Sequence, residues 1–324
     1  MNMVISPENL MTSIQIYVGL SWLKNHERGH QIMRDEQTMR TLILNVANSH
    51  KAIRVVTMNG SRVNPETAKD VHQDYDIVYY FDDADALSSR DWPTLFGDVL
   101  IMQTLEDMVF DPPPKMSGRV YLMQFTDGNR IDLSLKHVDQ LKDDLARDTL
   151  TAILLDKDKR IVKPPKPSLK SYHVRRPSEA VVASCVNECF WVAFYVLKGV
   201  ARNQMGYAQV HLDILRRCLE GMLAWSVGIE HDFAVSTGKH GANFTRYLRD
   251  DFVKRWLSTW PEADPLPVLH ALSSLLDLFV EVSAQVSDGL QITNPVLQYT
   301  AARHEIAARL EKLITAYARD NLSC

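Results

Sequence analysis

The chain has 324 residues, of which 46% are hydrophobic and 23% are charged, and its formal net charge is −4. This is the composition of an ordinary globular protein, long enough to form two domains with cores of their own. The acidic balance argues against a nucleic-acid binder, whose surface is usually strongly basic, and leaves room for a cationic partner.

The four cysteines form no CxxC pair, so a reducing cytoplasm is the simplest interpretation. The most apolar long run, residues 180–200, is interrupted by Asn187, Glu188 and Lys198, which makes it too polar for a bilayer span of about 20 residues. Residues 1–32 lack the basic start, apolar centre and cleavage site of a secretion signal. We therefore expect a cytoplasmic protein without a membrane segment.

Residues 1–32 are expected to be an N-terminal extension, either an accessory helix or a leader. Met33 is a second possible start, because residues 35–48 already show the apolar spacing of an amphipathic helix. Within the extension, residues 26–30 (HERGH) match the HExxH pattern, in which two histidines bind zinc and the glutamate activates water. Because Gly29 weakens the required helix, we interpret this tract as a solvated polar segment.

Residues 53–81 predict a strand, a tight turn at Asn59-Gly60-Ser61, a polar insert and a second strand. The turn would expose backbone N–H groups that can cradle a phosphate. Asp74 and Asp76 open the second strand, and the two-residue period of a strand points both carboxylates to one face, about 6.6 Å apart. Two carboxylates placed in this way can share a divalent metal ion.

Further strands are expected at residues 98–105 and in a hairpin formed by residues 119–125 and 130–135, whose turn is Asp127-Gly128-Asn129. Asp132 lies between two apolar residues of the second hairpin strand. Alone it would be expected to face water, but it can also supply a third carboxylate to the pair. A helix over residues 138–146 and a short strand over residues 150–155 follow.

The composition then changes: residues 157–176 are rich in Lys, Arg and Pro, as expected of an exposed linker. We expect a first domain over residues 33–160 that contains the sheet, a linker over 161–177 and a helical domain over 178–324. Long periodic patterns predict its helices at residues 178–202, 207–227, 266–286 and 296–321, the first capped by Ser178. The expected fold class is α+β: a mixed sheet with flanking helices, followed by an all-α bundle.

The Gly60-Ser61 turn, the Asp74-x-Asp76 pair and a third acid on a later strand form the pattern of DNA polymerase β type nucleotidyltransferases. Nucleotidyl transfer uses two metal ions about 3.5–4 Å apart, which three carboxylates on adjacent strands can bridge. The chain further resembles the aminoglycoside 6-adenylyltransferases, the streptomycin adenylyltransferases of bacteria, from about Met33 to near the C-terminus. The runs that carry this resemblance are residues 53–65 (IRVVTMNGSRVNP), 74–81 (DYDIVYYF), 127–135 (DGNRIDLSL), 187–202 (NECFWVAFYVLKGVAR) and 238–248 (GKHGANFTRYL).

This resemblance implies a cytosolic bacterial resistance enzyme that moves AMP from ATP onto a hydroxyl of streptomycin, releases pyrophosphate and uses two magnesium ions. By position, Asp74 and Asp76 would be metal ligands. Asp132 would be the third acid, which ligates a metal or accepts the hydroxyl proton. Gly60, Ser61 and Arg62 would face the triphosphate, although Arg62 could instead pair with a nearby carboxylate.

In the helical half, Asn187, Glu188 and Trp191 interrupt an apolar helix within about one turn. Two explanations stand side by side: groups in a cleft that bind the guanidinium groups of the drug, with Glu188 as a second candidate base, or a buried hydrogen bond between helices. Lys198 and Arg202 are i,i+4 neighbours that could meet phosphate or simply extend into solvent.

Gly238-Lys239 is not a P-loop, because the upstream glycine is absent, but by resemblance Lys239 is expected to contact the triphosphate. An acidic cleft would attract a polycationic drug. Two alternatives are a nucleotidyltransferase for another small molecule or a protein hydroxyl, and a catalytically silent partner protein, against which the retention of all three acids argues. The choice of base, the modified hydroxyl and the oligomeric state stay open.

Overall fold

The computed structural model describes residues 32–83, 91–114 and 118–322. The chain divides into two compact units, with the division after Ser168. This point falls inside residues 161–177, the segment expected to be a linker, and the domain bounds themselves stay a prediction. The N-terminal extension, with its HExxH match, lies outside the described residues except for Ile32.

The first unit contains a six-stranded mixed sheet in the order β3-β4-β5-β2-β1-β6. The strands are β1 (Ile53–Asn59), β2 (Tyr75–Phe81), β3 (Val99–Thr104), β4 (Arg119–Phe125), β5 (Arg130–His137) and β6 (Thr151–Asp156). The pair β2 and β5 is parallel, and the other neighbouring pairs are antiparallel. The two strands expected to carry the acids therefore lie side by side in the middle of the sheet.

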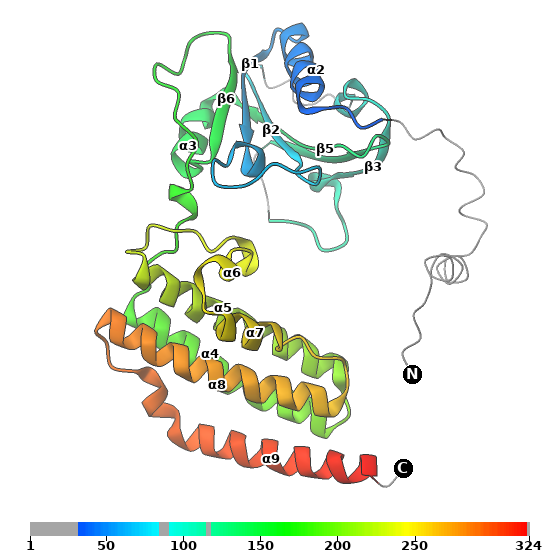
Figure 1. Cartoon of the computed structure of the whole chain (residues 1–324). Helices are drawn as coiled ribbons and strands as arrows, with labels where there is room; N and C mark the ends of the chain where they lie inside the picture. The colour runs from blue at the N-terminus through cyan, green and yellow to red at the C-terminus, as the bar shows by residue number, and fades with distance from the viewer. Residues whose placement is uncertain (1–31, 84–90, 115–117, 323–324) are drawn as a thin grey trace, which may run out of the picture. The chain divides into compact units, whose positions relative to one another are not determined.

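One face of the sheet is covered by α2 (Glu36–Ser49), as Figure 1 shows. Asp35 caps this helix, because its carboxylate accepts the Thr38 N–H at 2.8 Å. The apolar stripe of α2, which includes Met39 and Ile43, packs with alternate residues of the strands. In β5, Leu133 is fully buried on this face whereas its neighbours are half-buried, so the two faces have different environments.

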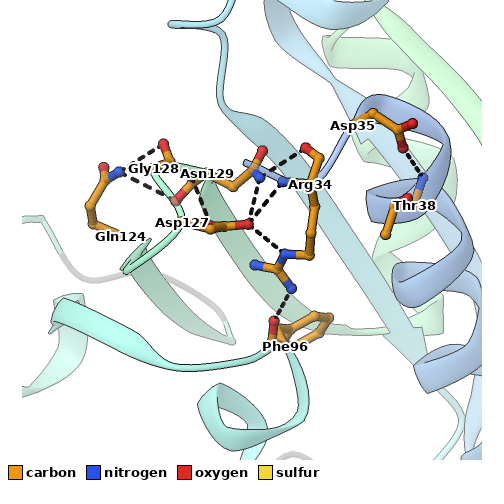
Figure 2. A network of polar contacts seen from close by, with 8 residues as sticks. All are labelled: Arg34, Asp35, Thr38, Phe96, Gln124, Asp127, Gly128 and Asn129. Atoms are coloured by element: carbon orange, nitrogen blue, oxygen red, sulfur yellow. Dashed lines mark hydrogen bonds and ion pairs between the residues drawn. The ribbon is translucent and has the colours of Figure 1, made fainter. Parts of the chain in front are cut away.

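A buried polar network fastens the segment before α2 to the turn between β4 and β5 (Figure 2). Arg34 donates from Nε to Asp127 Oδ2 at 2.6 Å and from Nη1 to the Phe96 carbonyl at 2.6 Å. Asn129 Nδ2 donates to the same Asp127 oxygen at 2.9 Å and to the Arg34 carbonyl at 3.1 Å. Burial alone would raise the pKa of Asp127, but hydrogen bonds from Arg34 and Asn129 outweigh it, and the pKa is lowered.

Within the described residues of the first unit, the other face of the sheet is covered at one end only. There Val55 and Tyr80 form a small core with Val138 and Leu141, beside α3 (Leu141–Arg147). Beyond this cluster the side chains on that face, such as Ser134 and Asp132, are half-buried. The polar side chains on this part of the face therefore remain partly exposed to solvent.

Helices are the only regular secondary structure in the described residues of the second unit, as predicted. Its helices are α4 (Glu179–Ala201), α5 (Met205–Glu230), α6 (Phe244–Tyr247), α7 (Asp250–Leu257), α8 (Pro265–Leu290) and α9 (Thr300–Leu322). Ser178 is the N-cap of α4, since its hydroxyl accepts the Val181 N–H at 3.4 Å. The sequence did not predict α6 and α7. Residues of α4, α5 and α8 share one core, and these helices run alongside one another in Figure 1.

Among the described residues, α4 and α8 have the length and apolar composition of a membrane-spanning helix, so the expectation that residues 180–200 are too polar for one was wrong. About half of each apolar window is buried inside the protein: 44% for α4 and 50% for α8. The core helices of a folded bundle pass the same test, and both helices contribute to the bundle core. Together, a mixed sheet followed by a helical bundle confirms the predicted α+β class.

Candidate active site

A row of polar side chains crosses the uncovered face of the sheet. Asp132 on β5 is the register partner of Asp76 on β2, and Asp76 is the partner of Asn59 on β1. Asn59 in turn pairs with Thr151 on β6. Register partners on neighbouring strands point to the same face, so four strands contribute one polar residue each to a single line.

Three carboxylates meet in this row. Asp74, directly before β2, joins Asp76 and Asp132, and one oxygen from each of the three lies within 4.8 Å of the others. Burial, with the negative charges of Asp74 and Asp132, raises the pKa of Asp76 to about 7. The site is therefore a place where negative charge is crowded and incompletely neutralised.

Arg130 is the cation nearest to this cluster, and the sequence analysis missed it. Its Nε and Nη2 donate to the two oxygens of Asp132 at 2.8 and 2.7 Å, and Nε lies 3.7 Å from Asp74 Oδ2. Arg130 stands two residues before Asp132 on β5, so the same period-two rule that paired Asp74 with Asp76 could have placed it on the acid-bearing face.

The donor set fits a divalent metal ion of the magnesium type. Hard cations prefer oxygen ligands, and Mg²⁺ in proteins is usually held by one or two carboxylates together with substrate phosphates. Burial and the charges of Asp74 and Asp132 together raise the pKa of Asp76, and a cation among the three acids would offset both by stabilising the ionised form. Arg130 neutralises only part of this charge.

Gly60 lies directly against the acids. It opens a 3-10 turn, Gly60–Val63, at the end of β1, and its φ is +74°. A Cβ at this position would collide with Asp76 Oδ2. The glycine is therefore needed both for its backbone conformation and for the close approach of the chain to the carboxylate. Ser61 follows in the turn and is half-buried, and its carbonyl accepts a hydrogen bond from Gln73 Nε2 at 3.2 Å.

Arg62 binds main-chain carbonyls. Its Nε donates to the Asp74 carbonyl at 3.0 Å, and Nη2 donates to the Gln73 carbonyl at 2.6 Å. The guanidinium carbon lies 3.7 Å from the centre of the Tyr75 ring. These bonds to carbonyls and the aromatic ring engage the Arg62 side chain, and its pairing with a carboxylate stays a prediction. Arg62 thereby holds the entry to β2 in place, and its contact with triphosphate stays a prediction.

Asn59 fixes a fourth acid near the row. Its Nδ2 donates to Asp148 Oδ2 at 3.0 Å and to Thr151 Oγ1 at 2.8 Å, and its Oδ1 accepts from Thr57 Oγ1 at 3.1 Å. The charge of Asp148 adds to the influences that raise the pKa of Asp76. No local sequence pattern links Asp148 to this site, because the link runs through pairing between β1 and β6.

The helical unit carries the remaining predicted residues, which are described separately from the acids. Asn187, Glu188 and Trp191 all lie on the exposed side of α4, and Trp191 is 60% exposed. Asn187 Nδ2 donates to the Tyr299 hydroxyl at 2.9 Å, and Trp191 Nε1 donates to the Tyr195 hydroxyl at 2.9 Å. Of the two expected explanations, the hydrogen bond between helices exists in part: Asn187 on α4 binds Tyr299 of the 3-10 segment that precedes α9, but the bond lies at the surface and is not buried.

The three predicted cationic residues of the helical unit are also exposed. Lys198 Nζ lies 6.0 Å from the ring centres of both Tyr195 and Tyr207. Arg202 is the C-cap residue of α4. Lys239 begins a short turn between Gly238 and His240, both of which have positive φ. The roles of these residues, like those of the acids, stay predictions.

The chain is similar to known proteins over most of its length. The model of a family described as streptomycin adenylyltransferase matches residues 33–304. An aminoglycoside 6-adenylyltransferase of Campylobacter jejuni is 37% identical over 267 residues, which cover 82% of this chain and 92% of that protein. The protein of the same name from Bacillus subtilis (strain 168) is 35% identical over 266 residues, 81% of this chain and 94% of that protein.

Among solved structures, an aminoglycoside 6-adenyltransferase from Bacillus subtilis aligns with 87% of this chain and 99% of its own, at 30% identity and a TM-score of 0.41. The match to the family begins at Met33, so residues 1–32 lie outside it.

Proposed function

Because the chain belongs to the streptomycin adenylyltransferase family, we propose that it transfers the adenylyl group of ATP to a hydroxyl of streptomycin and releases pyrophosphate. The observation that carries this proposal is the meeting of Asp74, Asp76 and Asp132 beside the Gly60 turn. Phosphoryl-type transfer requires little covalent chemistry from a protein, and it depends on holding charge and geometry at the phosphorus. A cluster of three acids on rigid strands provides such a position.

The acids of this cluster are proposed to hold two Mg²⁺ ions together with the phosphates of ATP. When bound, these ions lower the pKa of the attacking hydroxyl and stabilise negative charge at the phosphorus. Asp76 on β2 and Asp74, directly before that strand, are assigned as ligands. Asp132 is assigned either as a further ligand or as acceptor of the hydroxyl proton, and Glu188 is the alternative acceptor.

The Gly60 turn is proposed to bind the terminal phosphates, because its chain passes directly against Asp76 and its backbone amides and Ser61 hydroxyl are hydrogen-bond donors. Arg62 would support that turn. Lys198, Arg202 and Lys239 are exposed cations that we assign to the triphosphate by family position.

Asn187, Glu188 and Trp191 are proposed to contact the acceptor. Their exposure on α4 leaves them free to do so, and a carboxylate beside an indole suits guanidinium groups through charge and cation–π attraction. We propose a cytoplasmic enzyme of a bacterium, where ATP is available, and streptomycin resistance as its consequence.

Purified protein incubated with ATP, Mg²⁺ and streptomycin tests the proposal by mass spectrometry. Streptomycin should gain the mass of one adenylyl group with the wild type and not with Asp76→Asn, and pyrophosphate should appear in equal amount. Kanamycin, incubated in parallel, tests the acceptor. An unmodified streptomycin pool would contradict the proposal. Label from α-phosphate-labelled ATP found on protein instead would favour a protein hydroxyl as acceptor.

A further inference from the structure

A shallow depression of about 250 Å³ lies at the β3–β4 end of the sheet. Its lining includes Ile101, Met102, Gln103, Leu122, Gln124 and Arg130. Neither the family motifs nor the proposed roles above use the residues of β3 and β4. Arg130 is shared: it borders the depression and also binds Asp132, so the depression is adjacent to the acid cluster.

The strand register places this depression on the acid-bearing face. Leu122 on β4 is the register partner of Asp132, and Gln103 on β3 is the partner of Leu122. Gln124 pairs with Arg130 in the same way. The line of register partners that begins at Thr151 therefore continues past the acids, through the apolar Leu122, to Gln103 on the same face of the sheet. Neighbouring strands are about 4.8 Å apart, so Gln103 lies roughly 10 Å from Asp132.

The geometry of adenylyl transfer determines from which side of the acid cluster the acceptor hydroxyl must approach. In an in-line displacement the attacking oxygen and the leaving group stand on opposite sides of the phosphorus. With the leaving phosphates at the Gly60 turn, next to β1, the α-phosphorus lies over Asp76 and Asp132. The attacking hydroxyl must then approach from the side away from β1, which is the side of β4 and β3.

The chemistry of the depression suits a ring with an apolar face and polar edges. Ile101 is 66% exposed and Leu122 is half-buried, so both offer aliphatic surface. Gln103 is exposed and provides amide donors and acceptors at the rim. The one cation of the lining, Arg130, is bound to Asp132 and lies close to Asp74, which reduces its repulsion of a positively charged ligand.

We propose that this β3–β4 depression is an acceptor subsite, which holds the ring of the aminoglycoside that bears the reacting hydroxyl. The inference rests on the proposed function, because it takes its direction from the placement of the leaving phosphates. An adenine ring is the competing occupant, since a purine also packs on aliphatic surface, and the sign of an added charge separates the two.

Charge changes at Gln103 test the subsite. Gln103→Lys should raise the KM for streptomycin about three- to tenfold, because it adds a positive charge beside a cationic ligand, and Gln103→Glu should lower it about twofold. Equilibrium binding of streptomycin without ATP should shift in the same two directions. Both variants should fold, because charged residues are well tolerated on an exposed edge strand.

Gln37→Lys and Gln37→Glu are the matched controls, since Gln37 is an exposed glutamine on α2, which covers the opposite face of the sheet. Each Gln37 variant has the same net charge as the corresponding Gln103 variant, and neither should change the KM for streptomycin. If Gln103→Lys instead lowers the KM for ATP and Gln103→Glu raises it, the depression holds the nucleotide and the inference is overturned.

Equal kinetics in all four variants would also overturn the inference, while wild-type turnover would leave the proposed function intact. A wild type that adenylates no aminoglycoside would instead refute the proposed function, and the subsite with it.

Discussion

Asp127 and Asp76 are two carboxylates of the same sheet with opposite electrostatics. Asp127, at the β4–β5 turn, is surrounded by donors from Arg34 and Asn129, and its pKa is lowered. Asp76, in the middle of the sheet, faces Asp74 and Asp132, and its pKa is raised to about 7. The charge of Asp127 is compensated by hydrogen-bond donors of the protein, whereas the charge of Asp76 is not fully compensated by a neighbouring cation.

The difference separates a stabilising site from a functional one. The Asp127 network joins the segment before α2 to a hairpin turn and leaves little for a ligand to bind (Figure 2). Burial and like-charge crowding at the Asp76 cluster cost folding free energy, and such a cost is typical of a site whose charge a ligand neutralises. The two sites therefore predict opposite responses to loss of the carboxylate.

The largest effect is expected from Asp76→Asn. Adenylyl transfer should fall by about a thousandfold, because one of the groups that hold charge at the phosphorus is lost. Without Mg²⁺ the variant should be more stable than the wild type by about 2–4 kcal/mol at pH 8, since a neutral amide avoids both the desolvation of the carboxylate and its repulsion by Asp74 and Asp132. Turnover assays and urea unfolding measure the two effects, and a destabilised Asp76→Asn protein would contradict them.

The pH dependence of this gain has a definite sign. Folded Asp76 keeps its proton up to a pKa of about 7, whereas an unfolded aspartate loses it near 3.8. The folded state thus binds more protons between these values, and wild-type stability falls as pH rises through that window. The advantage of Asp76→Asn should be small at pH 4, grow up to about pH 7 and then level off. A constant advantage from pH 4 to 8 would rule this out.

Asp127→Ala should act in the opposite direction. Removing the buried acceptor leaves Arg34 and Asn129 without their partner, so the free energy of unfolding should fall by about 2–4 kcal/mol. Because the folded pKa of Asp127 is lowered, its contribution is present above about pH 4 and is lost as pH falls further. Activity per folded molecule should change much less than in Asp76→Asn. Unchanged stability would show that the network is dispensable.

Arg130→Gln tests the charge of the Asp76 cluster, and its expected effect is smaller than those of the two aspartate variants. It removes the guanidinium that partly neutralises Asp132 and Asp74, so a divalent cation should bind about three- to tenfold more tightly. Mn²⁺ binding followed by electron paramagnetic resonance measures this without requiring turnover. Arg147→Gln, at an exposed arginine that contacts Asp144, serves as the control. Weaker Mn²⁺ binding in Arg130→Gln would mean that Arg130 orders the acids instead.

The smallest change in stability is expected at Trp191. Its side chain is 60% exposed, so Trp191→Ala should alter the free energy of unfolding by less than about 1 kcal/mol. If the indole contacts the acceptor, the KM for streptomycin should nevertheless rise about tenfold with the KM for ATP unchanged. Equal KM values for streptomycin in the two proteins would remove Trp191 from the acceptor site.

Local patterns predicted much of the fold. The hairpin over β4 and β5 followed from Asp127-Gly128-Asn129 between two alternating strands, and α4 followed from Ser178 and its apolar run. The two-residue period of a strand predicted that the carboxylates of Asp74 and Asp76 lie on the same face. These features depend on residues that are close in sequence.

The rest depended on pairings between distant segments. The bonds from Arg62 to the carbonyls before β2, and the link from Asn59 to Asp148, exist only because β1 lies between β2 and β6. The sequence around Asp127 predicted a turn, but no pattern of neighbouring residues indicated that Arg34 binds its carboxylate. The short helix α7 was missed because its eight residues give too brief a pattern.

The most direct test of the central claim measures the free energy of unfolding of three proteins, with and without Mg²⁺ at pH 8. Asp76→Asn should be more stable than the wild type without Mg²⁺ and gain little when it is added. Asp127→Ala should be less stable than the wild type and gain as much from Mg²⁺ as the wild type does. If instead both variants are destabilised and respond to Mg²⁺ alike, the two carboxylates do not differ as proposed.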